Sequence, residues 1–471
     1  MDISRNIRWA AVEAASGHIL GMVSYFILAR MLGPEPFGVV AMASVFSSAL
    51  SVLGGLGLQQ AIIQQHTLDE DHLDGSFWLI LLAGIVLFIL SVLLSPSLAA
   101  VYNEPQIAEV FPWLIGAVVL NHLGTIQSAV LQKNLLFRAL AIRGGISALV
   151  GCSVGILMAY ENFGIWSLVG QQMSAALVST VSLWMASPWQ PRLRWCWKKM
   201  HPLVRFSVQL QAFSILVLIS GQIDKFLIGY LYGAKESGIY ALAYKFLEVT
   251  NNVFVNSGMK VSFPVFCKLQ DDPQGLAESY YAFVSHTAFI ACPVFLAIAV
   301  GSPEIIPRVF GSAWSYSATI LQVLCFLGIL QSVSFYTMTA LLALGQTGAR
   351  LFLILLHTCF NVLFIWYGQR FGIIGVAIAF VTRAWLLYPV GLIALSNYID
   401  ISYKRILVAI IEPGSQLFVG SFAYVAATQF FPANTILIVT SYVICFLPLC
   451  GSLYKYTWQR KPSFSVLSQR Q

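Results

Sequence analysis

Three basic side chains lie inside long apolar stretches of this sequence. They are Lys225, Lys245 and Arg383, and each falls several residues from the ends of its stretch. A charged group in an apolar segment is costly, and it usually marks a binding pathway or a buried partner. Lysine presents a point charge and arginine a planar fork, and both bind phosphate and carboxylate. These residues are therefore candidates for a cationic cleft that binds an anionic substrate.

Acidic residues near these cations support a competing interpretation. Asp224 directly precedes Lys225, and Glu248 follows Lys245 at the i+3 position of a helix. Residues at that spacing face one another, so Glu248 could pair with Lys245, or else with Arg383. Asp224 could likewise pair with Lys245, and such pairs would only lock the fold. We weigh substrate contact and pairing evenly for Lys225 and Arg383, and favour pairing for Glu248.

Histidines and one more carboxylate also fall in apolar stretches. Glu13 and His18 lie in the first stretch, and either could carry a coupling proton. A histidine that only packs is the favoured interpretation of His18. His122 and His357 are interpreted as structural residues.

The elements that hold these residues are predicted to be transmembrane helices. Apolar residues make up 58% of the chain and charged residues 10%, against roughly 45–50% and about 25% in soluble domains. Apolar runs long enough to cross a bilayer recur along the chain, without the alternation of a membrane barrel. The predicted fold is an all-α integral membrane protein with about 14 transmembrane helices. The expected spans lie near residues 8–30, 37–61, 76–100, 109–131, 139–160, 164–186, 205–231, 237–261, 278–301, 315–344, 350–368, 373–396, 406–430 and 434–455.

Basic residues predict the orientation. With these spans, most of the 26 Lys and Arg residues fall on the side of the N-terminus. The opposite side holds Arg30, Lys235, Arg308 and Arg370. Cytoplasmic loops carry the excess of positive charge, so both termini are expected in the cytoplasm. The net charge of +7 is thus assigned to membrane orientation, and no nucleic-acid partner is expected.

Two short sequence echoes indicate an internal repeat. LGPEPFGVVAMA at 32–43 recurs as YGAKESGIYALA at 232–243, which aligns Gly33 and Gly38 with Gly233 and Gly238. FGI at 163–165 recurs at 371–373. Glycine allows the sharp turn that a re-entering helix needs. The expected organisation is two parallel six-helix lobes, 1–190 and 205–398, joined by a cytoplasmic interfacial linker at 191–204. Two additional helices and a cytoplasmic tail are expected at 399–471.

Other motifs give no sign of a cofactor. The loop HTLDEDHLD at 66–74 has metal-ligating residue types, but a solvated acidic turn is favoured. The segment 188–202, rich in Trp, Lys and Arg, suits contact with membrane lipids, although a structural linker is favoured. The sequence has no GxxxxGK[ST] loop, so energy is expected from an ion gradient or from removal of the product.

The turn motifs resemble those of a known family. Arg30, Gly33 and Gly38 belong to a pattern that looks like the start of polysaccharide-unit flippases, nearest the colanic and teichuronic acid exporters. The segment GQIDKFLIGYLYGAKESGIY at 221–240 is similar to that family's seventh-helix motif. The resemblance implies a V-shaped two-lobed fold in a bacterial cytoplasmic membrane. It implies export of undecaprenyl-diphosphate-linked oligosaccharides, with H+ or Na+ as a candidate coupling ion and a polysaccharide polymerase and export machinery as candidate partners.

Three rival functions remain at this point. A drug or toxic-compound extruder would have the same fold, but it would favour an acidic, aromatic pocket rather than a basic one. A lipid II flippase belongs to the same superfamily. A membrane glycan polymerase or ligase usually needs a large extramembrane loop, and none is predicted here. The sequence therefore predicts a transporter and not an enzyme.

Overall fold

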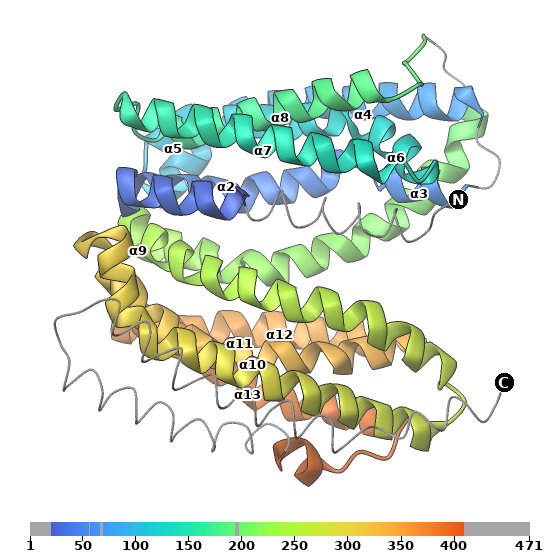
Figure 1. Ribbon diagram of the computed structural model, residues 1–471, viewed down its shortest axis with the longest axis vertical. Coiled ribbons are helices and arrows are strands. Elements are labelled where there is room, and N and C mark those ends of the chain that lie inside the picture. The colour runs from blue at the N-terminus through green and yellow to red at the C-terminus, as the bar shows by residue number, and fades with distance from the viewer. Residues whose placement is uncertain (1–19, 56, 66–68, 194–196, 409–471) are drawn as a thin grey trace. The chain divides into compact units, whose positions relative to one another are not determined.

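The computed structural model describes residues 20–55, 57–65, 69–193 and 197–408 (Figure 1). Within these ranges all regular secondary structure is helical, in agreement with the predicted all-α class. Glu13, His18 and nearly all of the last two predicted spans lie outside the described residues.

The first half of the described chain contains eight helical segments. They are Leu20–Leu32, α2 Pro34–Gly55, α3 Leu58–Gln64, α4 Glu70–Tyr102, α5 Gln106–Leu123, α6 Thr125–Lys133, α7 Phe137–Tyr160 and α8 Trp166–Ala186. Helix α7 packs along α8, and α5 packs against α2, α4 and α8. The core between α2, α4 and α5 is apolar, with Val39, Met42, Phe111 and Ile115 buried in it.

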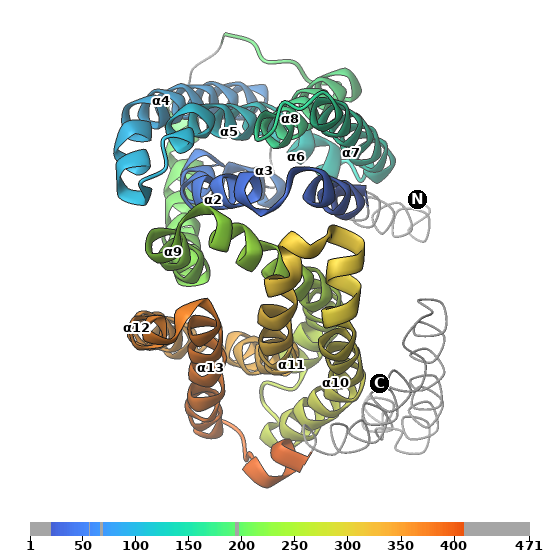
Figure 2. The same cartoon turned by 90° about the vertical axis from the view of Figure 1, so that its left-hand side faces the viewer.

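The second half follows the same pattern with longer helices. These are α9 Trp197–Lys268, α10 Pro273–Phe310, α11 Ser315–Ala343, α12 Thr347–Gly368 and α13 Gly372–Ser396, with short 3-10 turns at Ser312–Trp314 and Gln369–Phe371. Helix α9 covers two predicted spans, which are separated by Gly233 at φ 80° and ψ −169°. Helices α12 and α13 lie side by side, and both pack against α11 (Figure 2).

Length and hydropathy suit a membrane. Seven helices in the described part of the chain are long and apolar enough to cross one. Helix α4 shows how such a helix meets lipid, because Leu82, Ile85, Ile89 and Leu93 are exposed at roughly helical spacing along one face. In water this stripe would be an aggregation hazard, whereas against lipid tails it needs no cover.

The turns of the two halves share an unusual backbone conformation. Gly33 and Gly233 have φ of 76° and 80°, and Gly164 and Gly372 have φ of 57° and 74°. These are the two glycine pairs that the sequence echoes align. At positive φ glycine has no steric penalty. Gly33, Gly233 and Gly372 lie where one helical segment directly follows another, whereas Gly164 lies in the short turn of residues 161–165.

Two further turn pairs were not visible in the sequence. Leu135 and Gly345, 210 positions apart, have φ of 58° and 72°. After each, a backbone N–H returns to a carbonyl five residues earlier: Leu136 to Leu131 at 2.9 Å and Gln346 to Leu341 at 2.8 Å. Asn103 and Gly311, 208 positions apart, also have positive φ, at 52° and 101°. The internal repeat is thus preserved as backbone geometry where the residue types differ.

Contacts divide the chain into two compact units. The first comprises the described residues up to Ala241 together with Val309–Trp314, and the second comprises Leu242–Arg308 and the described residues from Ser315 onward. The lobe limits 1–190 and 205–398 follow the repeat and stay predictions.

Candidate functional site

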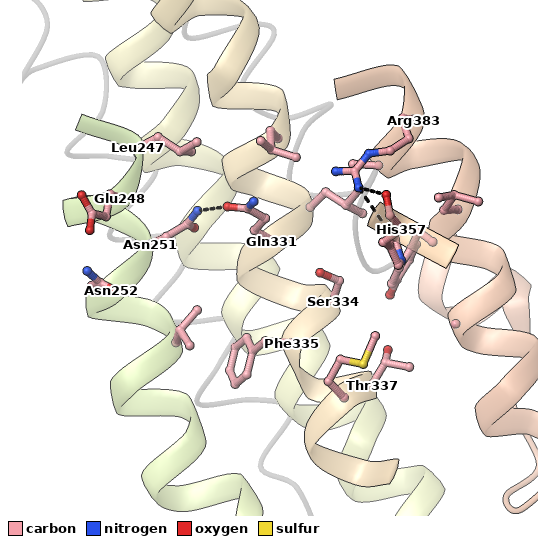
Figure 3. Close-up of a pocket in the computed structure, with 18 of the residues that line it drawn as sticks. Leu247, Glu248, Asn251, Asn252, Gln331, Ser334, Phe335, Thr337, His357 and Arg383 are labelled. Carbon is pink, nitrogen blue, oxygen red and sulfur yellow. Dashed lines mark hydrogen bonds between the residues drawn. The ribbon is translucent and has the colours of Figure 1, made fainter. Parts of the chain in front are cut away.

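A pocket with both polar and apolar lining residues lies between four helices of the second unit. It holds about 420 Å³, within the range of about 300–1,000 Å³ that small-molecule sites occupy. Figure 3 shows it between the C-terminal part of α9, the middle of α11, and α12 and α13. Its polar lining residues are Tyr244, Glu248, Asn251, Asn252, Gln331, Ser334, Thr337, His357, Arg383 and Tyr388.

Helical spacing brings these polar residues to one place. On α9, Glu248, Asn251, Asn252 and Val255 follow one another at i, i+3, i+4 and i+7, which is one face of a helix. On α11, Gln331, Ser334, Phe335 and Met338 repeat the same spacing. Two largely apolar helices therefore turn a polar stripe toward a shared cavity.

An amide pair joins the two stripes. Asn251 Nδ2 donates a hydrogen bond to Gln331 Oε1 at 2.6 Å (Figure 3). Asn251 is only 7% exposed, and buried amides in apolar surroundings require partners. The pair fixes the orientation of both side chains at the edge of the pocket.

Arg383 enters the pocket from α13 and is held by α12. It is 8% exposed, and its Nη1 donates to the His357 carbonyl oxygen at 3.1 Å and lies 3.4 Å from His357 Nδ1. Its guanidinium carbon also lies 4.8 Å from the centre of the Phe380 ring, in cation–π geometry. Here His357, interpreted from the sequence as structural, is a pocket residue that positions the buried cation.

The other predicted charges lie in different surroundings. Lys245 Nζ pairs with Glu248 Oε2 at 3.1 Å, and both side chains are partly exposed, so the pairing favoured for Glu248 is present. Arg383 and Glu248 line the pocket. Lys225 belongs to the first unit, and the three-cation cleft stays a prediction.

Asp224 has a partner that the sequence did not indicate. This carboxylate is 1% exposed, and its Oδ2 accepts a hydrogen bond at 3.0 Å from the hydroxyl of Tyr240. The two residues lie on opposite sides of the Gly233 break in α9. The hydrogen bond therefore connects the two parts of α9 on either side of Gly233, and it compensates part of the free-energy cost of burying the carboxylate.

The repeated glycines meet each other in the first unit. A Cβ placed on Gly38 would lie 2.5 Å from the Ala234 carbonyl carbon, and one placed on Gly238 would lie 2.8 Å from the Pro34 carbonyl carbon. The contact is reciprocal, because Pro34 and Ala234 are also related by the repeat. Glycine at both positions lets two helix backbones touch, as small residues do in membrane helix packing.

Arg30 and the residue before it fix a distant turn. Arg30 Nη1 donates to the Val309 carbonyl oxygen at 2.5 Å, and Trp314 Nε1 donates to the Ala29 carbonyl oxygen at 3.0 Å. Trp314 is almost fully buried. The turn between α10 and α11 is therefore packed on the end of the first described helix.

Sequence similarity assigns the chain to a family. Residues 27–319, more than half of the chain, match the family described as "Polysaccharide biosynthesis protein". The chain belongs to this family. The resemblance seen in the turn motifs is confirmed.

Individual relatives are identical to the chain at about a quarter of the aligned positions. The succinoglycan biosynthesis transport protein ExoT of Rhizobium meliloti is 27% identical over 323 residues, which span 68% of this chain and 65% of ExoT. The lipopolysaccharide biosynthesis protein WzxC of Escherichia coli is 27% identical over 79% of this chain and 76% of its own. The teichuronic acid biosynthesis protein TuaB of Bacillus subtilis is 24% identical over 73% and 72%.

Solved structures share the fold. The lipid II flippase MurJ in an inward closed conformation matches 95% of this chain and 98% of its own with a TM-score of 0.74 and 15% identity. An inward-facing multidrug resistance MATE transporter matches 83% and 98% with a TM-score of 0.66 and 14% identity. The chain therefore has the same fold as these two proteins.

Proposed function

We propose that this chain translocates an oligosaccharide linked to undecaprenyl diphosphate across a bacterial cytoplasmic membrane, by alternating access, for assembly of a surface polysaccharide. Its family membership supports this function, as does the match to Agl15 of Haloferax volcanii, named a probable low-salt glycan biosynthesis flippase and 23% identical over 80% of each chain. The observation that carries the proposal is Arg383, a buried cation that lines a pocket within an apolar helical unit.

A buried arginine selects for an anion. The low local dielectric strengthens its attraction for phosphate or carboxylate and makes an organic cation unfavourable there. This charge argues against a drug extruder and for a glycolipid that carries a diphosphate or acidic sugars. We propose that Lys225 and Lys245 contact the same substrate during its passage.

The energy source and the cellular setting complete the proposal. The chain acts as a transporter and not as an enzyme, and it takes its energy from H+ or Na+ coupling or from consumption of the exported unit by a polysaccharide polymerase and its export machinery.

Both termini lie in the cytoplasm. Reporter fusions after Gln429 should then score outside and fusions after Gln471 inside, and the reverse pattern would refute this orientation.

Reconstitution tests the function directly. The purified protein is placed in liposomes that contain a labelled undecaprenyl-diphosphate-linked oligosaccharide, and a membrane-impermeant glycosidase reports how much glycan reaches the outer leaflet. We expect faster exposure with the protein than in empty liposomes, and a clear loss with Arg383→Gln. Equal rates with and without the protein would overturn the proposal.

A further inference from the structure

Two helices of the pocket carry more hydrogen-bonding groups than their packing requires. Asn251 and Asn252 on α9, and Gln331 and Ser334 on α11, all line the cavity, and Asn251 and Gln331 contact each other directly (Figure 3). One amide pair would suffice to join the helices, yet four polar side chains line this wall. Polar groups at such a position are expensive and mark a pathway or a ligand.

One atom of this wall lacks a partner. Asn251 Nδ2 is bonded to Gln331, but Asn251 Oδ1 is buried and accepts no hydrogen bond from any described residue. Such an acceptor costs about 1–3 kcal/mol unless a donor reaches it. This wall therefore holds more hydrogen-bonding capacity than the contact between α9 and α11 uses.

The remaining chemistry of the wall points to a sugar. Amide and hydroxyl side chains both donate and accept hydrogen bonds, as sugar hydroxyls do. Phe335, one residue from Ser334, adds an aromatic surface to the same cavity for the apolar face of a pyranose ring (Figure 3). A bare cation is disfavoured, because Glu248, the carboxylate among the lining residues, is already paired with Lys245.

We propose that Asn251, Asn252, Gln331 and Ser334 form a glycan subsite that reads the hydroxyl groups of one sugar ring. The amide and hydroxyl groups of these side chains exchange hydrogen bonds with the sugar hydroxyls, and Phe335 supports the ring. This inference rests on the proposed function, and it assigns substrate selection to uncharged side chains, separate from the attraction of the anion to Arg383.

The test separates sugar recognition from lipid and diphosphate. Oligosaccharides released by mild acid from the surface polysaccharide of the source cell are the probe, and saturation-transfer NMR measures their binding to the purified protein in nanodiscs. We expect binding to the wild type and about five- to tenfold weaker binding to Asn251→Leu, the loss expected for one hydrogen bond. Asn361→Leu is the matched control, because Asn361 is a buried amide of the same unit that does not line the pocket.

A double variant excludes a merely structural role. Replacing both Asn251 and Gln331 with leucine removes donor and acceptor together, which is close to neutral for folding when the shape is kept. If the pair only joined α9 to α11, the double variant would bind the glycan as the wild type does. A glycan subsite predicts that the double variant folds, as judged by size-exclusion chromatography, and still binds weakly.

The outcomes distinguish this inference from the proposed function. Wild-type binding by Asn251→Leu, or equal weakening in Asn361→Leu, would overturn the subsite while flipping in liposomes continued. No binding of the released glycan to a wild type that flips the lipid-linked form would also overturn it. Failure of the wild type to flip the lipid-linked oligosaccharide would instead refute the proposed function.

Discussion

The contact between Gly38 and Gly238 yields a sharp stability prediction. In Gly238→Ala the new methyl group would lie 2.8 Å from the Pro34 carbonyl carbon, whereas carbon atoms in contact prefer about 3.5–4.0 Å. The obstacle is backbone, so no side chain can rotate away. The Pro34 carbonyl oxygen lies closer still than the carbon, so the two helices must separate by more than about 0.7 Å, and overpacking of this kind costs about 1–3 kcal/mol.

The assay is the apparent melting temperature of the detergent-purified protein. A loss of that size corresponds to a decrease of about 2–12 °C in a unit of this length. Gly144→Ala is the control: Gly144 lies within α7, and its Cβ would meet nothing within 4 Å. The control should gain about 0.5–1 kcal/mol from helix propensity.

The double variant Gly38→Ala/Gly238→Ala gives a result that can refute this reasoning. Because Gly38 and Gly238 share one contact, the first alanine already separates the helices, and the second should add less than its own single effect. We therefore expect a double variant more stable than additivity predicts. A Gly238→Ala protein as stable as Gly144→Ala, or strictly additive losses, would contradict the close contact.

Three further predictions follow from other residues. Arg383→Ala should reduce export per membrane-inserted molecule, and Arg383→Lys should restore only part of the export, because the planar fork is lost. Adding Glu248→Gln should not rescue Arg383→Ala, and full rescue would contradict a role of Arg383 in binding the substrate. Tyr240→Phe removes a donor from the buried carboxylate of Asp224 and should cost about 1–3 kcal/mol, measured as a lower melting temperature. Leu135 has a left-handed backbone, which costs a leucine about 1–2 kcal/mol of stability. Leu135→Gly removes this cost and should raise the melting temperature.

Hydrophobic run length predicted most of the fold. Helices occupy each expected range between residues 20 and 396, because crossing a bilayer fixes both their length and their composition. Glycine turns were also predictable, since Gly33 and Gly233 stand in recognisable motifs. Leu135 was not, because its left-handed backbone is imposed by the returning hydrogen bond of Leu136 and not by its own side chain.

The partners of the buried polar groups were harder to predict. Sequence spacing found the pair Lys245 and Glu248, because both residues lie on one helix. Spacing could not show that Tyr240 would reach Asp224 across a kink, nor that His357 would present its carbonyl oxygen to Arg383 from a neighbouring helix. Such contacts depend on how helices pack, which a single sequence does not encode locally. The signal available in advance was the pair Asn251–Asn252 within an apolar run.

The repeated turns make the two halves of this protein comparable as if they were two homologous sequences. Ser24 and Tyr25 stand 200 positions before Asp224 and Lys225, and Val45 and Ser48 stand where the second half has Lys245 and Glu248. At these four pairs of positions the second half carries a charge and the first half does not. The same positive-φ turns thus accommodate uncharged side chains at these positions in one half, so the turns themselves do not require the charges of the other half.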